Sequence, residues 1–82
     1  MTIEEVISEL EGNDNHVRFS RLLAICQYFF GKPRVVGSHY IFKTPWTGDP
    51  RINLRRDKGN AKPYQVRQVL RSLRRLKDRG GN

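Results

Sequence analysis

The middle of the chain holds the feature that most restricts its fold: two β-prone runs, residues 35–36 (VV) and 39–42 (HYIF), separated only by Gly37 and Ser38. A Gly-Ser pair between such runs predicts a two-residue hairpin, and glycine at the first central position suits a type II′ turn. The two runs are therefore expected to pair as antiparallel strands. His39 becomes the first residue of the second strand, beside a tight turn.

Helical signals lie on both sides of this hairpin. Thr2 and Glu5 have the spacing of a capping box, and apolar residues at helical spacing follow them. A second apolar stripe predicts a helix over about residues 20–30, with Ser20 as its N-cap. Pro63 suits the first turn of a final helix, and the apolar period after it supports this helix.

A third strand and the order of the elements indicate the fold class. Residues 51–55 alternate in polarity, with Ile52 and Leu54 on one face, as in a half-buried strand. The order α-α-β-β-β-α predicts an α+β protein in which a three-stranded antiparallel sheet packs under helices. Its αβββα core order is that of the double-stranded-RNA-binding fold, preceded by an extra N-terminal helix. Fold alone does not define function.

Length and composition narrow the class of protein further. We expect residues 1–82 to form a single domain with a thin core, because a chain this short buries only roughly 60% of its unfolded surface. Cys26 is the sole cysteine, which fits a reducing compartment. The acidic start of the chain is unlike a signal peptide, and no apolar stretch is long enough to span a bilayer. A cytoplasmic protein with no membrane partner is expected.

The charge is divided unevenly along the chain. Residues 1–16 hold five acidic residues and no Lys or Arg, whereas residues 17–82 hold all sixteen basic residues and three acidic ones, a net charge of +13. Such asymmetry indicates a polyanionic partner. Nucleic acid is the first candidate, since phosphate contacts supply most non-specific affinity. An acidic protein, a membrane surface, or a soluble basic domain without such a partner are the alternatives.

The basic residues concentrate on the final helix and just before it. This arrangement resembles a surface that follows phosphates, although an arginine-rich outer face also serves for solvation alone. The candidate RNA-binding residues are Arg55, Arg56, Lys58, Lys62, Arg67, Arg71, Arg74 and Arg75. The aromatic residues that either stack on bases or pack in the core and loops are Tyr40, Phe42, Trp46 and Tyr64.

Among the side chains that carry out chemistry, His39 is the principal candidate. Cys26, His16 and His39 stand in different elements without metal-ligand spacing, so no metal site is expected. Ser38 and His39 do not form a catalytic pair, because neighbouring strand residues point to opposite faces. A histidine exchanges protons near neutral pH, which is the chemistry that RNA cleavage by the 2′-hydroxyl requires. His39 is thus either a catalyst or a structural histidine beside a turn.

Two stretches of the chain are similar to a known family. Residues 37–42, GSHYIF after a short strand, look like the signature of HicA-type toxins. Residues 53–70, which include AKPYQVRQ, are similar to the C-terminal half of an actinobacterial-looking branch of that family. The resemblance covers about residues 17–77, and it depends on the two stretches occurring together.

The resemblance implies a double-stranded-RNA-binding-like core over residues 17–79. An acidic N-terminal helix and turn, residues 1–16, precede it, and a loose tail, residues 80–82, follows. The implied function is the toxin component of a type II toxin–antitoxin system: an endoribonuclease that cleaves mRNA independently of the ribosome, without a metal or other cofactor, and so inhibits translation. A HicB-type antitoxin protein would cover its active site.

The resemblance also implies roles for single residues. His39 corresponds to the catalytic general acid/base, and Gly37 and Ser38 correspond to the turn that positions it. One departure is Tyr40, because many members of the family have a second histidine there; a slower reaction is expected if that histidine takes part. The acidic first helix lies outside the family core, and it either shields the basic surface or contacts a partner.

Two other classes of function stay open. A non-catalytic RNA-binding domain would use the same basic surface without cleaving its ligand. A protein-interaction module would present that surface to an acidic partner protein. The charge pattern alone does not separate these classes from an endoribonuclease.

Overall fold

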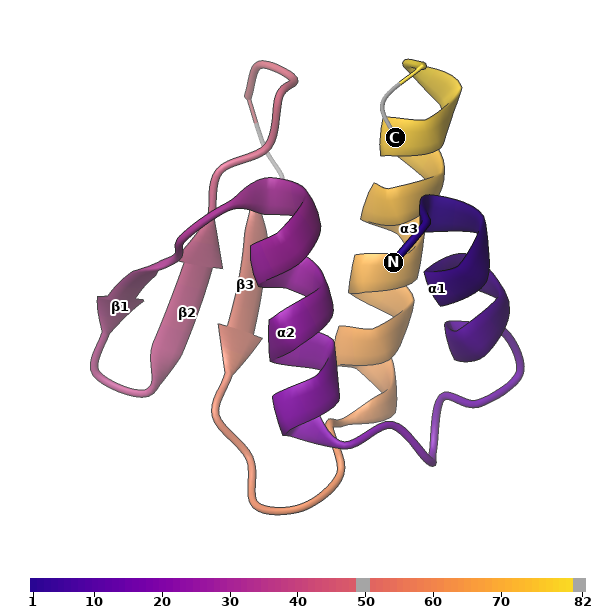
Figure 1. Cartoon of the computed structure of the whole chain (residues 1–82). Coiled ribbons are helices and arrows are strands. Elements are labelled where there is room, and N and C mark those ends of the chain that lie inside the picture. Colours follow the sequence, from indigo (N-terminus) through magenta and orange to yellow (C-terminus); the bar gives the residue numbers. More distant parts are fainter. Residues whose placement is uncertain (49–50, 81–82) are drawn as a thin grey trace.

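The structure is a computed structural model that describes residues 1–48 and 51–80, and its elements follow the predicted order (Figure 1). Three helices and three strands lie within these residues. They are α1 (Ile3–Leu10), α2 (Phe19–Phe30), β1 (Arg34–Val36), β2 (His39–Phe42), β3 (Ile52–Arg55) and α3 (Pro63–Asp78). Residues 49–50, at the end of a predicted loop, and 81–82, most of the expected loose tail, lie outside this description.

The predicted hairpin is present between β1 and β2. Val36 pairs with His39 across the turn, so only Gly37 and Ser38 connect the strands. Gly37 has a φ of +58° and Ser38 has no positive φ, which is the combination of φ signs that a type II′ turn requires. Glycine suits this position because other residues adopt a positive φ only at an energetic cost.

β3 pairs with the other side of β2 and completes an antiparallel sheet of order β1-β2-β3. Phe42, Ile52 and Leu54 point to one face of this sheet and are fully buried. The helices cover that face: α2 packs on β2 and α3 on β3 (Figure 1). The opposite face carries exposed residues such as His39, and we call it the open face. The predicted α+β architecture is therefore present, with helices on one side of the sheet.

α3 also occupies the outer edge of β3. The Gln68 side chain accepts a hydrogen bond from the Asn53 amide (2.9 Å) and donates one to the Asn53 carbonyl (3.2 Å). One turn earlier, Gln65 Nε2 donates to the Arg55 carbonyl (3.1 Å). These two side chains take the place of a fourth strand and protect this edge from pairing with another chain. β1, at the other edge, is three residues long and exposed.

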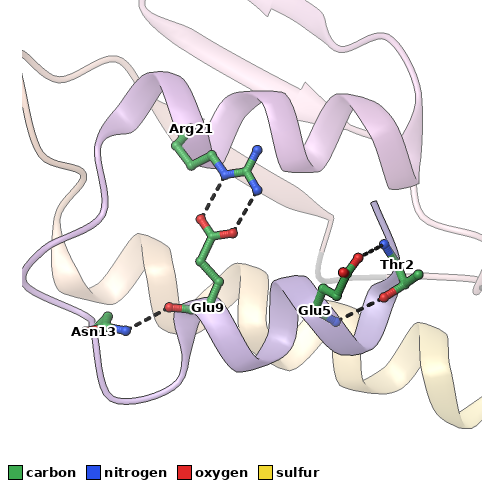
Figure 2. Close-up of polar contacts among 5 residues, drawn as sticks. All are labelled: Thr2, Glu5, Glu9, Asn13 and Arg21. Atoms are coloured by element: carbon green, nitrogen blue, oxygen red, sulfur yellow. Dashed lines mark hydrogen bonds and ion pairs between the residues drawn. The ribbon is translucent and has the colours of Figure 1, made fainter.

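α1 buries Ile3, Val6 and Leu10 and packs against α3. Its start is fixed by the predicted capping box (Figure 2). The Thr2 hydroxyl accepts a hydrogen bond from the Glu5 amide (3.2 Å), and the Glu5 carboxylate accepts one from the Thr2 amide (2.9 Å). Two main-chain donors that the first turn leaves unpaired are thereby satisfied.

A bidentate ion pair connects α1 to α2 (Figure 2). Nε and Nη2 of Arg21 donate to the two carboxylate oxygens of Glu9 at 2.8 and 2.7 Å. These hydrogen bonds favour the ionised carboxylate and so lower the pKa of Glu9. Asn13 Nδ2 donates to the Glu9 carbonyl (2.9 Å) near the end of α1. α1 is thus attached to both of the other helices.

The prediction of Ser20 as the N-cap of the second helix is wrong. α2 begins at Phe19 with Arg18 as its N-cap residue, and no side chain caps it. Main-chain pairing sets this boundary instead: the Phe19 amide donates to the Gly59 carbonyl (2.9 Å), and Arg18 forms an isolated bridge with Asn60. The partners come from a distant loop, so no local pattern around Ser20 indicates them.

Each helix turns an apolar side toward the core and leaves the other side polar. α2 buries Leu22, Ile25 and Cys26, and α3 buries Val66 and Leu73 among others. Within the described ranges, no helix has both the length and the apolar surface needed to cross a bilayer.

Candidate nucleic-acid site

His39 lies at the start of β2 on the open face and is exposed to solvent. Its Nδ1 is 3.0 Å from Oδ1 of Asn53, which lies on β3. An amide oxygen can only accept a hydrogen bond, so Nδ1 carries the proton and Nε2 keeps its lone pair. Nε2 is therefore the nitrogen that can take a proton from a ligand on this face.

Asn53 is itself held from the side opposite to His39. Its main-chain amide and carbonyl are both bonded by the side chain of Gln68 on α3. A connected series of hydrogen bonds thus runs from α3 through β3 to the imidazole ring. Because each member stands on a helix or a strand, regular structure and not a loop orients His39.

Arg55 is the cationic neighbour of His39 and pairs directly with it in the register of β2 and β3. The Arg55 carbonyl points to α3, where Gln65 binds it, so His39 and Arg55 form a non-hydrogen-bonded pair. In such pairs the Cα atoms are only about 4.5 Å apart and the side chains lie close together. No carboxylate of the described residues forms a salt bridge with Arg55, which leaves its charge available to an anionic ligand.

Further arginines share the open face. Arg34 on β1 pairs with Ile41 on β2, and this register places it on that face. Arg51 precedes β3 by one residue and, by the alternation of strand residues, points to the same face as Asn53. Both arginines are exposed. The surface around the histidine is therefore positively charged.

Tyr40 and Arg56 lie on the helix side of the sheet. Tyr40 is half-buried against Phe19, with ring centroids 5.8 Å apart. The Arg56 guanidinium hydrogen-bonds to the Tyr40 hydroxyl and lies 5.5 Å from the ring centroid. Position 40, where the resembling family has a second histidine, thus faces the helices and points away from His39. Arg56, a predicted RNA contact, is likewise on the opposite side of the sheet.

The arginines of α3 fall into two groups. Arg67 pairs with Asp14 (3.1 Å), and Arg74 pairs with Glu11. Both acids belong to the acidic segment of residues 1–16. This segment therefore partly neutralises one side of α3, which is one of the two roles expected of it.

Arg71 and Arg75 face β3 instead. The Arg75 guanidinium lies over the ring of Trp46, 4.5 Å from its centroid. Together with Arg51, these three residues line a hollow of about 260 Å³. The hollow brings part of the predicted basic helix surface next to the open face of the sheet.

The two predicted lysines lie at the N-terminal end of α3. Lys62 is its N-cap residue, and it lines a hollow of about 240 Å³ with Arg55 and Arg56. Lys58 is exposed in the preceding loop. Since Arg55 pairs with His39, these residues lie nearer to the histidine than the arginines around Trp46 do.

Other reactive side chains stand apart from His39. His16 lines a hollow with Glu9 and Arg21 in the region of the α1–α2 turn. Cys26 is buried in α2, and burial raises the pKa of its thiol to about 12, so it is unreactive at neutral pH. Among the described residues, no three His, Cys, Asp or Glu side chains gather as a metal site requires.

The sequence identified His39 but none of the residues that orient it. Asn53 stands between Ile52 and Leu54, so strand alternation does place it on the face away from the core. The cross-strand register that brings it to His39 is visible only in the structure. The contact of Gln68 with β3 likewise depends on how α3 packs.

Comparisons of the chain with protein-family models, with curated proteins and with solved structures gave no significant match. The interpretation of this site therefore depends on its own geometry. The resemblance seen in the sequence stays a prediction.

Proposed function

We propose that this chain binds single-stranded RNA on its open face and cleaves it with His39, as the mRNA-cleaving toxin of a HicA-type toxin–antitoxin pair. The observation that carries the proposal is the imidazole itself, exposed, bound at Nδ1 by Asn53 and free at Nε2. The arginines around it support a polyanionic ligand, because phosphate contacts dominate affinity for nucleic acids.

In the proposed reaction, Nε2 of His39 takes the proton of a ribose 2′-hydroxyl. The 2′-oxygen forms a bond to the adjacent phosphorus, and the bond from phosphorus to the 5′-oxygen of the next nucleotide breaks. Water gives a proton to the leaving oxygen, and His39 returns its proton to solvent. The products are a 2′,3′-cyclic phosphate and a 5′-hydroxyl, and no metal or cofactor takes part.

Arg55 has a defined role in this scheme. Attack by the 2′-oxygen increases the negative charge on the phosphoryl oxygens in the transition state. A guanidinium fixed beside the proton acceptor stabilises that charge without having to reorganise. Its planar fork also binds two phosphate oxygens at once, which fixes the orientation of the scissile phosphate.

A HicB-type antitoxin is the proposed protein partner, and the cytoplasm, where mRNA is translated, is the proposed location. Val35 and Val36 on β1 are exposed to 56% and 48%, next to the arginines of the open face. An acidic partner that covers this region gains apolar contacts as well as ion pairs. It also competes directly with RNA for the same surface.

Induced expression in a bacterial host tests this proposal. We expect the wild-type chain to arrest growth and to produce new mRNA 5′ ends in primer extension, and we expect both effects to vanish with His39→Ala. His16→Ala is the matched control, because it removes the other histidine of the chain and should retain both effects.

The same experiment distinguishes the alternative functions. Growth arrest that persists with His39→Ala, without new 5′ ends, would indicate a non-catalytic RNA-binding domain. A soluble, folded wild-type chain that neither arrests growth nor cleaves RNA would contradict the proposal and favour a protein-interaction module.

A further inference from the structure

We propose a second phosphate-binding subsite, in the hollow between Trp46 and α3, that holds the backbone of the same RNA strand that His39 cleaves. The identity of its ligand rests on the proposed function. The hollow has a volume of about 260 Å³, and we call it the Trp46 hollow. Its lining residues are Trp46, Arg51, Gln68, Arg71, Ser72 and Arg75.

The charge of the Trp46 hollow is not neutralised. Three arginines and no carboxylate line it. Arg51, Arg71 and Arg75 form no salt bridge with a carboxylate of the described residues. On the other side of the same helix, Arg67 and Arg74 do form such salt bridges. Guanidinium groups gathered without a counter-charge fit an anionic ligand, and their fork geometry suits phosphate oxygens.

A buried donor in the wall of this hollow also lacks a partner. Trp46 is only 8% exposed, and its Nε1–H has no hydrogen-bond acceptor among the described residues. Buried N–H groups in native proteins nearly always have an acceptor. Arg75 lies over the ring and Phe30 meets it at 82°, so little of the ring remains to stack on a base. The group that Trp46 can offer is its N–H, which suits a phosphate oxygen better than a nucleobase.

The size of the hollow agrees with a small anionic group. Pockets that enclose whole small molecules have volumes of roughly 300–1,000 Å³. The Trp46 hollow, at about 260 Å³, is below that range. A phosphate of a longer chain fits it better than a complete nucleotide or cofactor.

The position of the hollow links it to His39 through β3. Arg51 and Arg55 both point to the open face and are four residues apart, which is about 13 Å along a strand. Gln68 lines the hollow and also binds the main chain of Asn53, which orients the histidine. A strand that continues along β3 reaches both places. A dinucleotide has a single phosphate and cannot occupy both.

Binding measured without cleavage tests the subsite. In a His39→Ala background, the affinity for a fluorescein-labelled single-stranded RNA octanucleotide is measured by fluorescence anisotropy. Arg71→Gln and Arg51→Gln should each weaken binding roughly tenfold, as expected for a lost charged hydrogen bond. Lys77→Gln removes an equal charge from an exposed position of the same helix outside the hollow and should change affinity less than twofold. Combining the two arginine changes should reduce the salt dependence by about 0.7 per phosphate contact.

Trp46→Phe separates the donor from the packing, because it removes Nε1–H and keeps an aromatic ring. We expect a several-fold loss of affinity with an unchanged circular-dichroism melting curve. Octanucleotide affinity that is equal in Arg71→Gln and the parent, or that falls as much with Lys77→Gln, would overturn the subsite. So would an absence of RNA binding, or equal arginine-dependent binding of a polyglutamate peptide, which would indicate a protein ligand.

Cleavage separates the two proposals. With His39 intact, Arg71→Gln should lower kcat/KM for the octanucleotide and leave that for a dinucleotide unchanged. Arginine-dependent binding by a protein that cleaves nothing would support the subsite while refuting the proposed nuclease.

Discussion

Replacing Asn53 by alanine removes the acceptor that orients the His39 ring. Only the side chain is lost, because the main-chain hydrogen bonds between Asn53 and Gln68 do not depend on it. Both Asn53 and His39 are exposed, so no buried cavity results. The variant should therefore fold as the parent does, and its defect should appear in the reaction.

The expected size of this defect follows from one hydrogen bond. A hydrogen bond of this kind contributes about 0.5–1.5 kcal/mol. If the whole of it is lost in the transition state, kcat falls roughly two- to twelvefold. The KM should change little, since the basic residues that bind the strand are untouched. His39→Ala, in contrast, removes the proton acceptor and should abolish the reaction.

The assay is cleavage of a defined RNA by purified protein, measured as a function of pH. Asn53→Asp provides a second readout, because it keeps an oxygen acceptor and adds a negative charge that favours the protonated ring. Its rate profile should rise at a higher pH than that of the parent. If Asn53→Ala cleaves at the parental rate and Asn53→Asp leaves the profile unchanged, the hydrogen bond to His39 has no part in the reaction.

Three further predictions concern stability and reactivity. The Arg21 hydrogen bonds lower the pKa of Glu9, so this carboxylate stabilises the fold above about pH 4.5 and less as the pH falls below it; the Tm of Glu9→Gln should fall less between pH 7 and pH 3 than that of the parent, and parallel curves would refute this. Gly37→Ala should cost about 1 kcal/mol in urea unfolding, since φ is +58° but the added Cβ meets no atom within 4 Å; an unchanged midpoint would contradict the strained turn. The thiol of Cys26, with its pKa raised to about 12, should react with a thiol reagent at pH 8 only after unfolding, and rapid labelling of the native chain would contradict its burial.

Features with a local cause were predictable from the sequence. The two-residue turn at Gly37 depends on one backbone conformation, and the capping box of Thr2 and Glu5 depends on groups three residues apart. Pro63 marks the start of α3 because it fixes its own φ. The sheet order then followed, because neighbouring strands joined by short connections pair with one another.

Contacts between distant segments could not be predicted in this way. Helical spacing shows that Arg67 and Arg74 share one side of α3, but not that α1 occupies that side. Their partners, Asp14 and Glu11, are 53 and 63 residues away in the chain. The division of the basic helix into a neutralised and an unneutralised side is therefore a property of tertiary packing.

The candidate site shows the same limit. His39 was identified from the hairpin and the family resemblance, and its exposure on the open face agrees with a functional role. Asn53 and Gln68 were missed because an amide side chain has no distinctive pattern in a sequence. Arg51 was missed because it lies outside the basic run that drew attention to α3.

The most direct test of the central claim is the chemistry of the products formed by the purified chain. RNA of defined sequence is incubated in the presence of a chelator, alongside a copy with 2′-deoxy nucleotides at the cleavage position. The account predicts a 2′,3′-cyclic phosphate and a 5′-hydroxyl from the RNA, no cleavage of the deoxy copy, full activity of His16→Ala and none of His39→Ala. Cleavage of the deoxy copy, or cleavage that survives His39→Ala, would contradict it.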